Sequence, residues 1–170
     1  MKTVKGLISA ILLFVMATQY ASAQSTASAT ASATILTAIS LTKTVDMNFG
    51  NVSVQAGSGG TVILTPAGVR SVTGGVSLPA TAGTVTAASF TVGGEGSYTY
   101  SITLPATAHT IASGANTMTV TAFTSNPSGT GTLSSGSQTL TVGGTLNVAA
   151  GQTNGIYTSE TGFNVTVNYN

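Results

Sequence analysis

Apolar and polar residues alternate without interruption over the last stretch of the chain, residues 162–170. Successive side chains of a β-strand point to opposite faces, so this alternation predicts a strand with one apolar face. The residues on that face are Phe163, Val165, Val167 and Tyr169. Chain ends are usually held loosely. We therefore expect a strand this regular to pair within the fold or with another chain.

The same period of two runs through residues 25–41, where Ser and Thr separate small and aliphatic residues. The apolar positions, interrupted only by Thr37, are Ala27, Ala29, Ala31, Ala33, Ile35, Ile39 and Leu41. A helix would need apolar residues at spacings of three and four, so the pattern predicts an extended segment over residues 24–41. This segment is expected to be either the first strand of the domain or a strand donated to a partner.

Between these two ends, short apolar runs alternate with glycine-rich turns. The predicted strands are 61–65, 76–78, 87–92, 97–104, 116–123, 138–142 and 145–148. Glycines that supply positive φ or interrupt a ladder predict turns at Gly50-Asn51 and at Gly143-Gly144. Short strands with no helical segment between them are typical of an all-β antiparallel sandwich, which we assign to residues 42–170.

The clearest internal strand, 97–104, ends at a proline and carries a tyrosine-rich face. Its apolar positions are Tyr98, Tyr100, Ile102 and Leu104. Tyrosines on a secreted sandwich can form a stacking platform for sugars. Because these rings alternate with aliphatic residues and the chain has no Trp, we predict instead that they belong to the core.

The first 23 residues have the pattern of a secretory signal peptide. Lys2 and Lys5 precede the apolar run 7–17, and small residues precede Gln24. The run falls short of the roughly 20 residues that a membrane-spanning helix needs, and no later stretch is long enough. We therefore predict no membrane span in a mature chain that begins at Gln24. That chain is expected in the periplasm, at the cell surface or outside the cell.

Charge is scarce, at 4% of residues. Removal of the two signal lysines leaves Lys43 and Arg70 against Asp46, Glu95 and Glu160, which changes the formal charge from +1 to −1. A nucleic-acid partner requires a cluster of Lys and Arg, so this class of function is excluded. The chain has no Cys, so its stability has to come from packing and hydrogen bonding.

Residues suited to catalysis or metal binding are few and scattered. Asp46 begins a turn whose oxygens resemble the start of a calcium loop, but the twelfth position holds Gly57 where such a loop needs a Glu. Glu95 and Glu160 are expected in solvated turns, and His109, the single histidine, in a loop. We predict no enzyme activity and no cofactor or metal. An activity that depends on Glu95 or His109 would overturn this prediction.

Several segments together resemble a family of small secreted bacterial domains of unknown function. They are Phe49-Gly50-Asn51-Val52, residues 98–105, residues 140–148 and residues 155–169. The ending is also similar to that of spore coat protein U-like domains and archaic chaperone-usher pilins, which are immunoglobulin-like sandwiches with a penultimate tyrosine. This resemblance implies that an N-terminal strand is donated to a neighbouring subunit, after a periplasmic chaperone has held the groove. The chain departs from many pilins by lacking a disulfide, and its Ala-rich segment is small for a donor.

The sequence thus favours a non-catalytic, fimbria-like structural subunit whose partners are copies of itself or related subunits and a periplasmic chaperone. The alternative is a monomeric module that binds a glycan or another surface polymer through loops 106–116 or 125–136.

Overall fold

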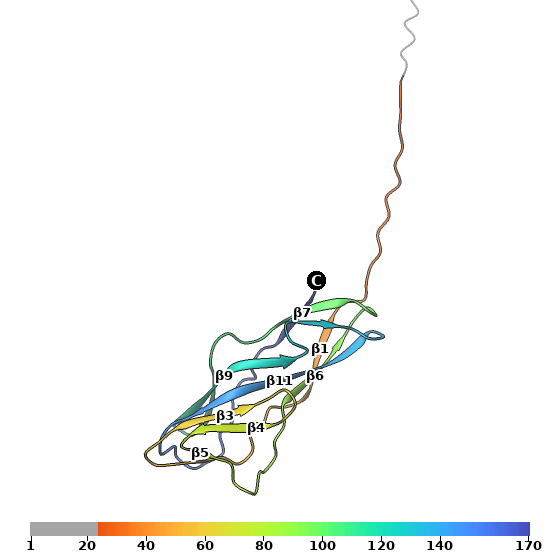
Figure 1. Cartoon of the computed structure of the whole chain (residues 1–170). Coiled ribbons are helices and arrows are strands. Elements are labelled where there is room, and N and C mark those ends of the chain that lie inside the picture. Colours follow the sequence, from red (N-terminus) through yellow and green to blue (C-terminus); the bar gives the residue numbers. More distant parts are fainter. Residues whose placement is uncertain (1–23) are drawn as a thin grey trace, which may run out of the picture. The chain divides into compact units, whose positions relative to one another are not determined.

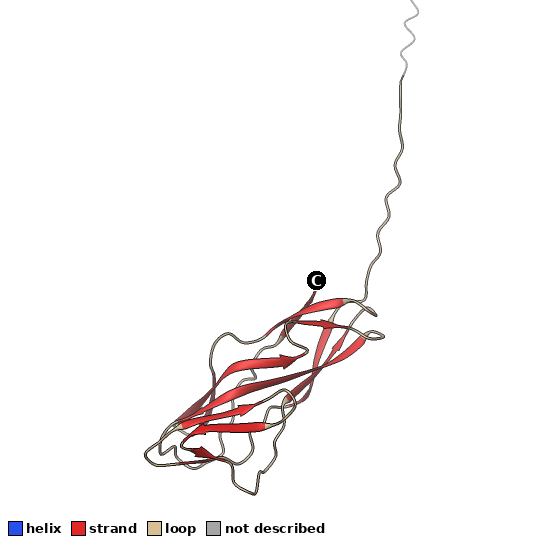
Figure 2. Cartoon of the chain, in the orientation of Figure 1, coloured by secondary structure: helices blue, strands red, loops and turns tan. Residues whose placement is uncertain are grey.

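The computed structural model describes residues 24–170, and every regular element in that range is a β-strand (Figures 1 and 2). The chain divides into a unit that ends at Ile35 and a folded body, Leu36–Asn170. The described part of the first unit, residues 24–35, forms no strand, and all its residues are exposed. The predicted signal peptide lies outside the described residues.

Twelve strands build the body. They are β1 (Ser40–Val45), β2 (Ser53–Val54), β3 (Gly60–Leu64), β4 (Arg70–Gly74), β5 (Val76–Ser77), β6 (Ala88–Gly93), β7 (Thr99–Thr103), β8 (His109–Ser113), β9 (Asn116–Asn126), β10 (Thr130–Thr132), β11 (Ser137–Val148) and β12 (Thr166–Tyr169). All the pairings between them are antiparallel. In the part of the chain that is described, no helix is long and apolar enough to cross a membrane.

The seven-stranded sheet is organised around β11, its longest strand (Figure 1). The first half of β11 pairs with β6, which pairs in turn with β1, and the second half pairs with β3, which pairs with β4. Residues of both halves also pair with β9, so β9 runs along the opposite side of β11. β8 then pairs with β9 and forms that edge of the sheet.

The second layer consists of a three-stranded sheet, β10-β7-β12, and the small β2-β5 pair. A cluster that we call the terminal-strand core joins the three-stranded sheet to β6 and the first half of β11. Its buried members are Ala88, Phe90, Val92, Tyr100, Leu133, Leu140, Val142 and Val167. The predicted all-β antiparallel sandwich is therefore confirmed.

A second cluster, which we call the groove core, lies on the other half of the large sheet. Its buried members are Phe49, Val62, Leu64, Val76, Val120, Leu146 and Val148. The strands of this cluster are the second half of β11 and its neighbours β3 and β9. Phe49, Val76 of β5 and the partly buried residues Met47, Val52, Val54, Leu78 and Val85 also pack into it. Short strands and loop segments thus supply the rest of this cluster, whereas the three-stranded sheet packs on the terminal-strand core.

The predicted turn at Gly143-Gly144 is wrong, because β11 runs straight through both glycines. Gly143 is needed for close approach. A Cβ at this position would collide with the carbonyl oxygen of Leu64 on β3 and with the backbone that follows it. At Gly50 the predicted positive φ is present, at +67, and the Gly50 N–H donates to the side-chain oxygen of Asn48 at 2.8 Å, although residues 49–52 form no regular turn.

Both terminal strands are shorter than the alternation predicted. The first begins only at Ser40, and the last covers Thr166–Tyr169 instead of the whole stretch from residue 162. The predicted periodicity of burial nevertheless extends through residues 163–169, whose odd positions are half-buried or buried and whose even positions are exposed.

Four strands were not predicted: β2, β4, β8 and β10. The loops proposed for ligand binding, 106–116 and 125–136, contain β8 and β10 respectively. The prediction that Tyr98 lies in the core is also wrong, since 43% of the residue is exposed, whereas Tyr100 on the same strand face is completely buried.

Candidate functional site

A groove of about 1110 Å³ lies over the large sheet, across the groove core and the adjoining residues Ala88 and Phe90 of the terminal-strand core. Its floor is apolar and comes from strands β6, β8, β9 and β11. The floor residues are Ala88, Phe90, Ile111, Met118, Val120, Leu146 and Val148. The walls are formed by residues 43–54 on one side and by residues within 152–163 on the other. The groove therefore lies beside the continuation of the first strand and the approach to the last strand.

The wall that leads into β12 has an unpaired backbone over most of its length (tan in Figure 2). Thr158 is attached to Ala112 of β8 by two backbone hydrogen bonds of 2.8 and 2.9 Å. From residue 159 to residue 165, the described chain makes no backbone–backbone hydrogen bond. The backbone of residues 159–165 is therefore irregular and unpaired within the described chain.

The opposite wall is held in place from outside the groove. Asn48 forms a bridge to Thr86, and Asn51 N–H donates to the carbonyl of Ala82 at 2.7 Å. The Arg70 guanidinium of β4 also donates to the carbonyl oxygens of Phe49, at 2.5 Å, and Asn51, at 3.0 Å. Arg70 is thus a fixing residue for this wall.

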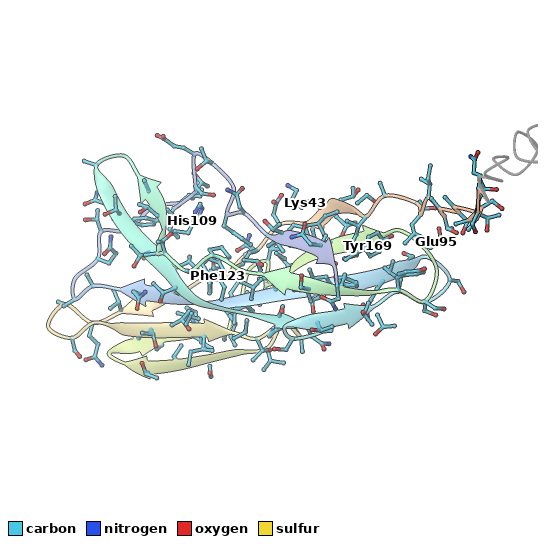
Figure 3. All side chains as sticks on the ribbon, turned by 90° about the horizontal axis from the view of Figure 1, so that it is seen from above. Lys43, Glu95, His109, Phe123 and Tyr169 are labelled. Carbon is cyan, nitrogen blue, oxygen red and sulfur yellow. The ribbon has the colours of Figure 1, made fainter. Side chains whose placement is uncertain are left out.

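An aromatic cluster lies where β8 and β9 meet the C-terminal wall. The ring of Phe163 lies 4.9 Å from that of Phe123 and 5.9 Å, edge to face, from that of His109. His109 stands on β8 and not in the predicted loop, and its Nε2 atom is buried without a hydrogen-bond partner in the described structure. Figure 3 shows His109 toward the end of the body opposite Glu95. The cluster fixes Phe163 against the sheet.

Three polar groups meet where the N-terminal segment joins the body, and Figure 3 shows two of them, Glu95 and Tyr169. The backbone N–H of Thr37 donates to the Glu95 carboxylate at 3.1 Å, and the Tyr169 hydroxyl donates to the Thr37 carbonyl at 2.8 Å. The same hydroxyl accepts the Glu95 N–H at 2.6 Å. The hydrogen bond from Thr37 holds the pKa of the Glu95 carboxyl below its ordinary value. We call these three residues the latch.

The seven residues singled out from the sequence occupy two different environments. Val167 is buried in the terminal-strand core, and five others are half-buried against it: Ile39, Leu41, Phe163, Val165 and Tyr169. Ile35 is 96% exposed and belongs to the first unit. The structure therefore brings together six of the seven residues, and Ile35 is the exception.

The groups considered for chemistry do not gather at one place. Asp46 forms an exposed ion pair with Lys43, with 2.6 Å between Nζ and Oδ1, and Glu160 is exposed. Within residues 24–170, no three side chains of the types that bind metal are close enough to hold an ion. The sequence analysis missed the partners of Glu95 and the floor contributed by β8, because both depend on contacts between distant segments.

Comparison with known families gives one result. The chain matches the family described as "Domain of unknown function (DUF4402)" over residues 39–169, which is nearly the whole folded body. The chain belongs to this family. No curated protein matches it, and no solved structure matches it. The family begins one residue before β1 and ends with the last residue of β12, so the DUF4402 domain includes the groove and Tyr169 but neither residues 24–35 nor Thr37.

Proposed function

We propose that this DUF4402 protein is a non-catalytic structural subunit, exported and fimbria-like, that assembles by adding a β-strand of one copy to the groove of another. The observation that carries the proposal is the groove itself. An apolar floor lies beside residues 159–165, whose backbone is unpaired. Strand addition uses both features, because ladder hydrogen bonds give affinity and pockets for alternate side chains give specificity.

The N-terminal segment, residues 24–35, is the proposed donor. It is extended and exposed, carries no charged residue, and places Ala or Ile at every second position from residue 27 to residue 35. A fully extended segment of this length reaches up to roughly 40 Å, which is ample for a strand of ordinary length. Burial of its apolar face in the groove would remove from water the side chain of Ile35, which the body leaves exposed.

The expected route and surroundings come from the sequence. The predicted signal peptide would export the chain, and the resemblance to spore coat protein U-like domains and archaic chaperone-usher pilins suggests a periplasmic chaperone that occupies the groove before assembly. Copies of this chain or related subunits would then form the polymer. An immunoglobulin-like relationship of the sandwich is part of the same proposal.

The test compares the mature chain with a version that begins at Leu36. Size exclusion with light scattering, followed by negative-stain microscopy, should find oligomers or filaments for the full chain and a folded monomer for the shorter one. The matched pair Ile35→Asp and Thr34→Asp separates the two faces of the segment. The first should block assembly, while the second should permit it. A full chain that stays monomeric at high concentration would refute the proposal.

A second candidate function, binding of an uncharged glycan, is supported by the outer face of the large sheet. A rank of hydroxyl and amide side chains crosses five strands there: Thr110, Thr119, Asn147, Thr61 and Thr73. None carries charge, and threonine offers both a methyl group and a hydroxyl to a sugar. Glycan-array binding that is lost in Thr61→Val and retained in Ile35→Asp would favour this function over strand addition.

A further inference from the structure

The latch at Thr37 controls where the N-terminal segment is able to go. We propose that Glu95 and Tyr169 prevent the segment from entering the groove of its own chain and thereby direct it to a second copy. The inference rests on the proposed function, because it concerns the same segment and groove. It adds a partner, a second copy of this chain, and two positioning residues that select this partner.

The latch holds both backbone polar groups of one residue. The N–H of Thr37 is bound by the Glu95 carboxylate at 3.1 Å, and its carbonyl by the Tyr169 hydroxyl at 2.8 Å. A phenol hydroxyl has one donor and can also accept, and that of Tyr169 uses both functions, since it accepts the N–H of Glu95 at 2.6 Å. Thr37 is thereby fixed to the β6–β7 turn and to the last strand at once.

Space for this arrangement is reserved at Gly94. A Cβ on Gly94 would collide with the hydroxyl of Tyr169, so a larger residue would displace the phenol from Thr37. Tyr169 is also braced by Tyr98, whose ring lies 5.8 Å away in an edge-to-face arrangement. The turn and the neighbouring ring therefore position the Tyr169 hydroxyl for its hydrogen bond to Thr37.

Insertion into the same chain's groove requires the polypeptide to reverse direction close to the latch. The groove begins beside Lys43 and Val45 of β1, and β1 starts at Ser40. A segment that ends at Ile35 would have to turn back within residues 36–39 to run along β1. Hairpin connections of two to five residues need their own backbone geometry and hydrogen bonds, and Thr37 lies inside this one. Such a turn is incompatible with the two hydrogen bonds that the Thr37 backbone makes in the latch.

The reversal is further opposed by the last residue of the connection. Ile39 is half-buried and packs against the terminal-strand core, so residues 36–39 are attached to the body at two points. Self-insertion would have to release both, whereas insertion into another copy releases neither. This difference in the contacts released favours insertion into another copy, although the groove is the same in both cases.

The absence of natural cysteines allows a direct test. Ala29→Cys in the segment and Ser159→Cys on the groove wall report insertion, because a disulfide forms only when the two Cα atoms come within about 7 Å. On a denaturing gel, an intrachain bond gives a monomer and an interchain bond gives a ladder. We expect a ladder for the double-cysteine protein whose latch residues are unaltered. In Tyr169→Phe and in Glu95→Ala, the ratio of intrachain to interchain product should rise roughly two- to tenfold for each hydrogen bond lost.

Tyr98→Phe is the matched control, because it keeps the ring beside Tyr169 and removes only an exposed hydroxyl. This hydroxyl has no hydrogen-bond partner within residues 24–170. The ratio of intrachain to interchain product should therefore stay unchanged. Urea unfolding of each variant establishes that the body remains folded. Equal ratios in Tyr169→Phe and the parent would overturn the latch and leave strand addition standing. An intrachain product in every variant, the parent included, would also overturn it. If no variant forms either disulfide, the segment does not enter the groove and both proposals fail.

Discussion

Replacement of Val167 by Asp tests the burial of the last strand. Val167 is 8% exposed, lies opposite Ile102 of β7, and belongs to the terminal-strand core. Loss of its buried side chain removes about 2 kcal/mol of hydrophobic stabilisation. An unpaired carboxylate in the same place adds a desolvation cost of several kcal/mol. The sum, about 4 kcal/mol or more, is a large part of the 5–15 kcal/mol by which a domain is stable.

Two further variants separate the loss of the buried side chain from the introduction of a charge. Val167→Ala removes two carbon atoms and leaves a cavity, so it should cost roughly 2–3 kcal/mol and lower Tm by about 5–10 °C. Asn168→Asp introduces the same carboxylate on the exposed face of the same strand and should change stability by less than about 0.5 kcal/mol. Urea unfolding followed by circular dichroism measures all three. Superimposable curves for Val167→Asp and Asn168→Asp would refute the assignment of Val167 to a buried face.

Four further predictions concern other parts of the body. Gly143→Ala should destabilise by about 1–3 kcal/mol, because its Cβ meets the backbone of β3, whereas Gly162→Ala, with open space around it, should be nearly neutral in the same unfolding assay. Tyr100→Phe should lower the free energy of unfolding by about 1 kcal/mol, because it removes the 2.7 Å hydrogen bond to Gln138. An unchanged unfolding midpoint would contradict this prediction. Burial raises the pKa of Tyr100, so its contribution to stability is present below pH 10.0 and lost as pH rises through the raised pKa; an ultraviolet titration in which all tyrosines ionise together would contradict this. The lowered pKa of Glu95 gives the opposite sign, since its hydrogen bond to the N-terminal connection is retained above pH 4.5 and lost as pH falls through the lowered pKa, which a carboxyl NMR titration of the parent measures.

Much of the fold could be predicted from period-two alternation, because a strand buried on one face leaves that signature in the sequence. The central strand β6 follows it closely, since Ala88, Phe90 and Val92 are its buried residues. The alternation failed next to the last strand, where the described chain offers no neighbouring strand. Residues 162–165 have the pattern of a strand and its periodic burial, yet no neighbour pairs with them.

Glycine was the main source of error in the predicted topology. A Gly-Gly pair usually interrupts a strand, but at Gly143 the missing side chain lets β3 approach β11 closely. This reason depends on a neighbour more than seventy residues away in sequence, since the nearest atom belongs to Leu64. β8 was missed because its sequence, HTIAS, has only one large aliphatic residue.

For the candidate site, the sequence predicted the apolar face of the last strand and the turn at Glu95, but it did not predict the groove. Alternation identified Tyr169 and the apolar face of the last strand, and the sequence placed Glu95 correctly in a turn. That Glu95 and Tyr169 meet Thr37 follows only from the arrangement of three distant segments. The groove is formed by four strands and two loop segments that are distant in the sequence, and no local pattern records such an arrangement.

The change of partners along β11 has a consequence for how the domain unfolds. A single strand supplies Leu140 and Val142 to one hydrophobic cluster and Leu146 and Val148 to the other, with β6 and β3 successively beside it. Neither half of the body can therefore open without loosening the strand that the other half needs. The body should unfold in one cooperative step, with the amide protons of β11 among the slowest to exchange with solvent and those of residues 159–165 among the fastest. The unpaired stretch 159–165 can then fluctuate while the remainder of the domain stays closed.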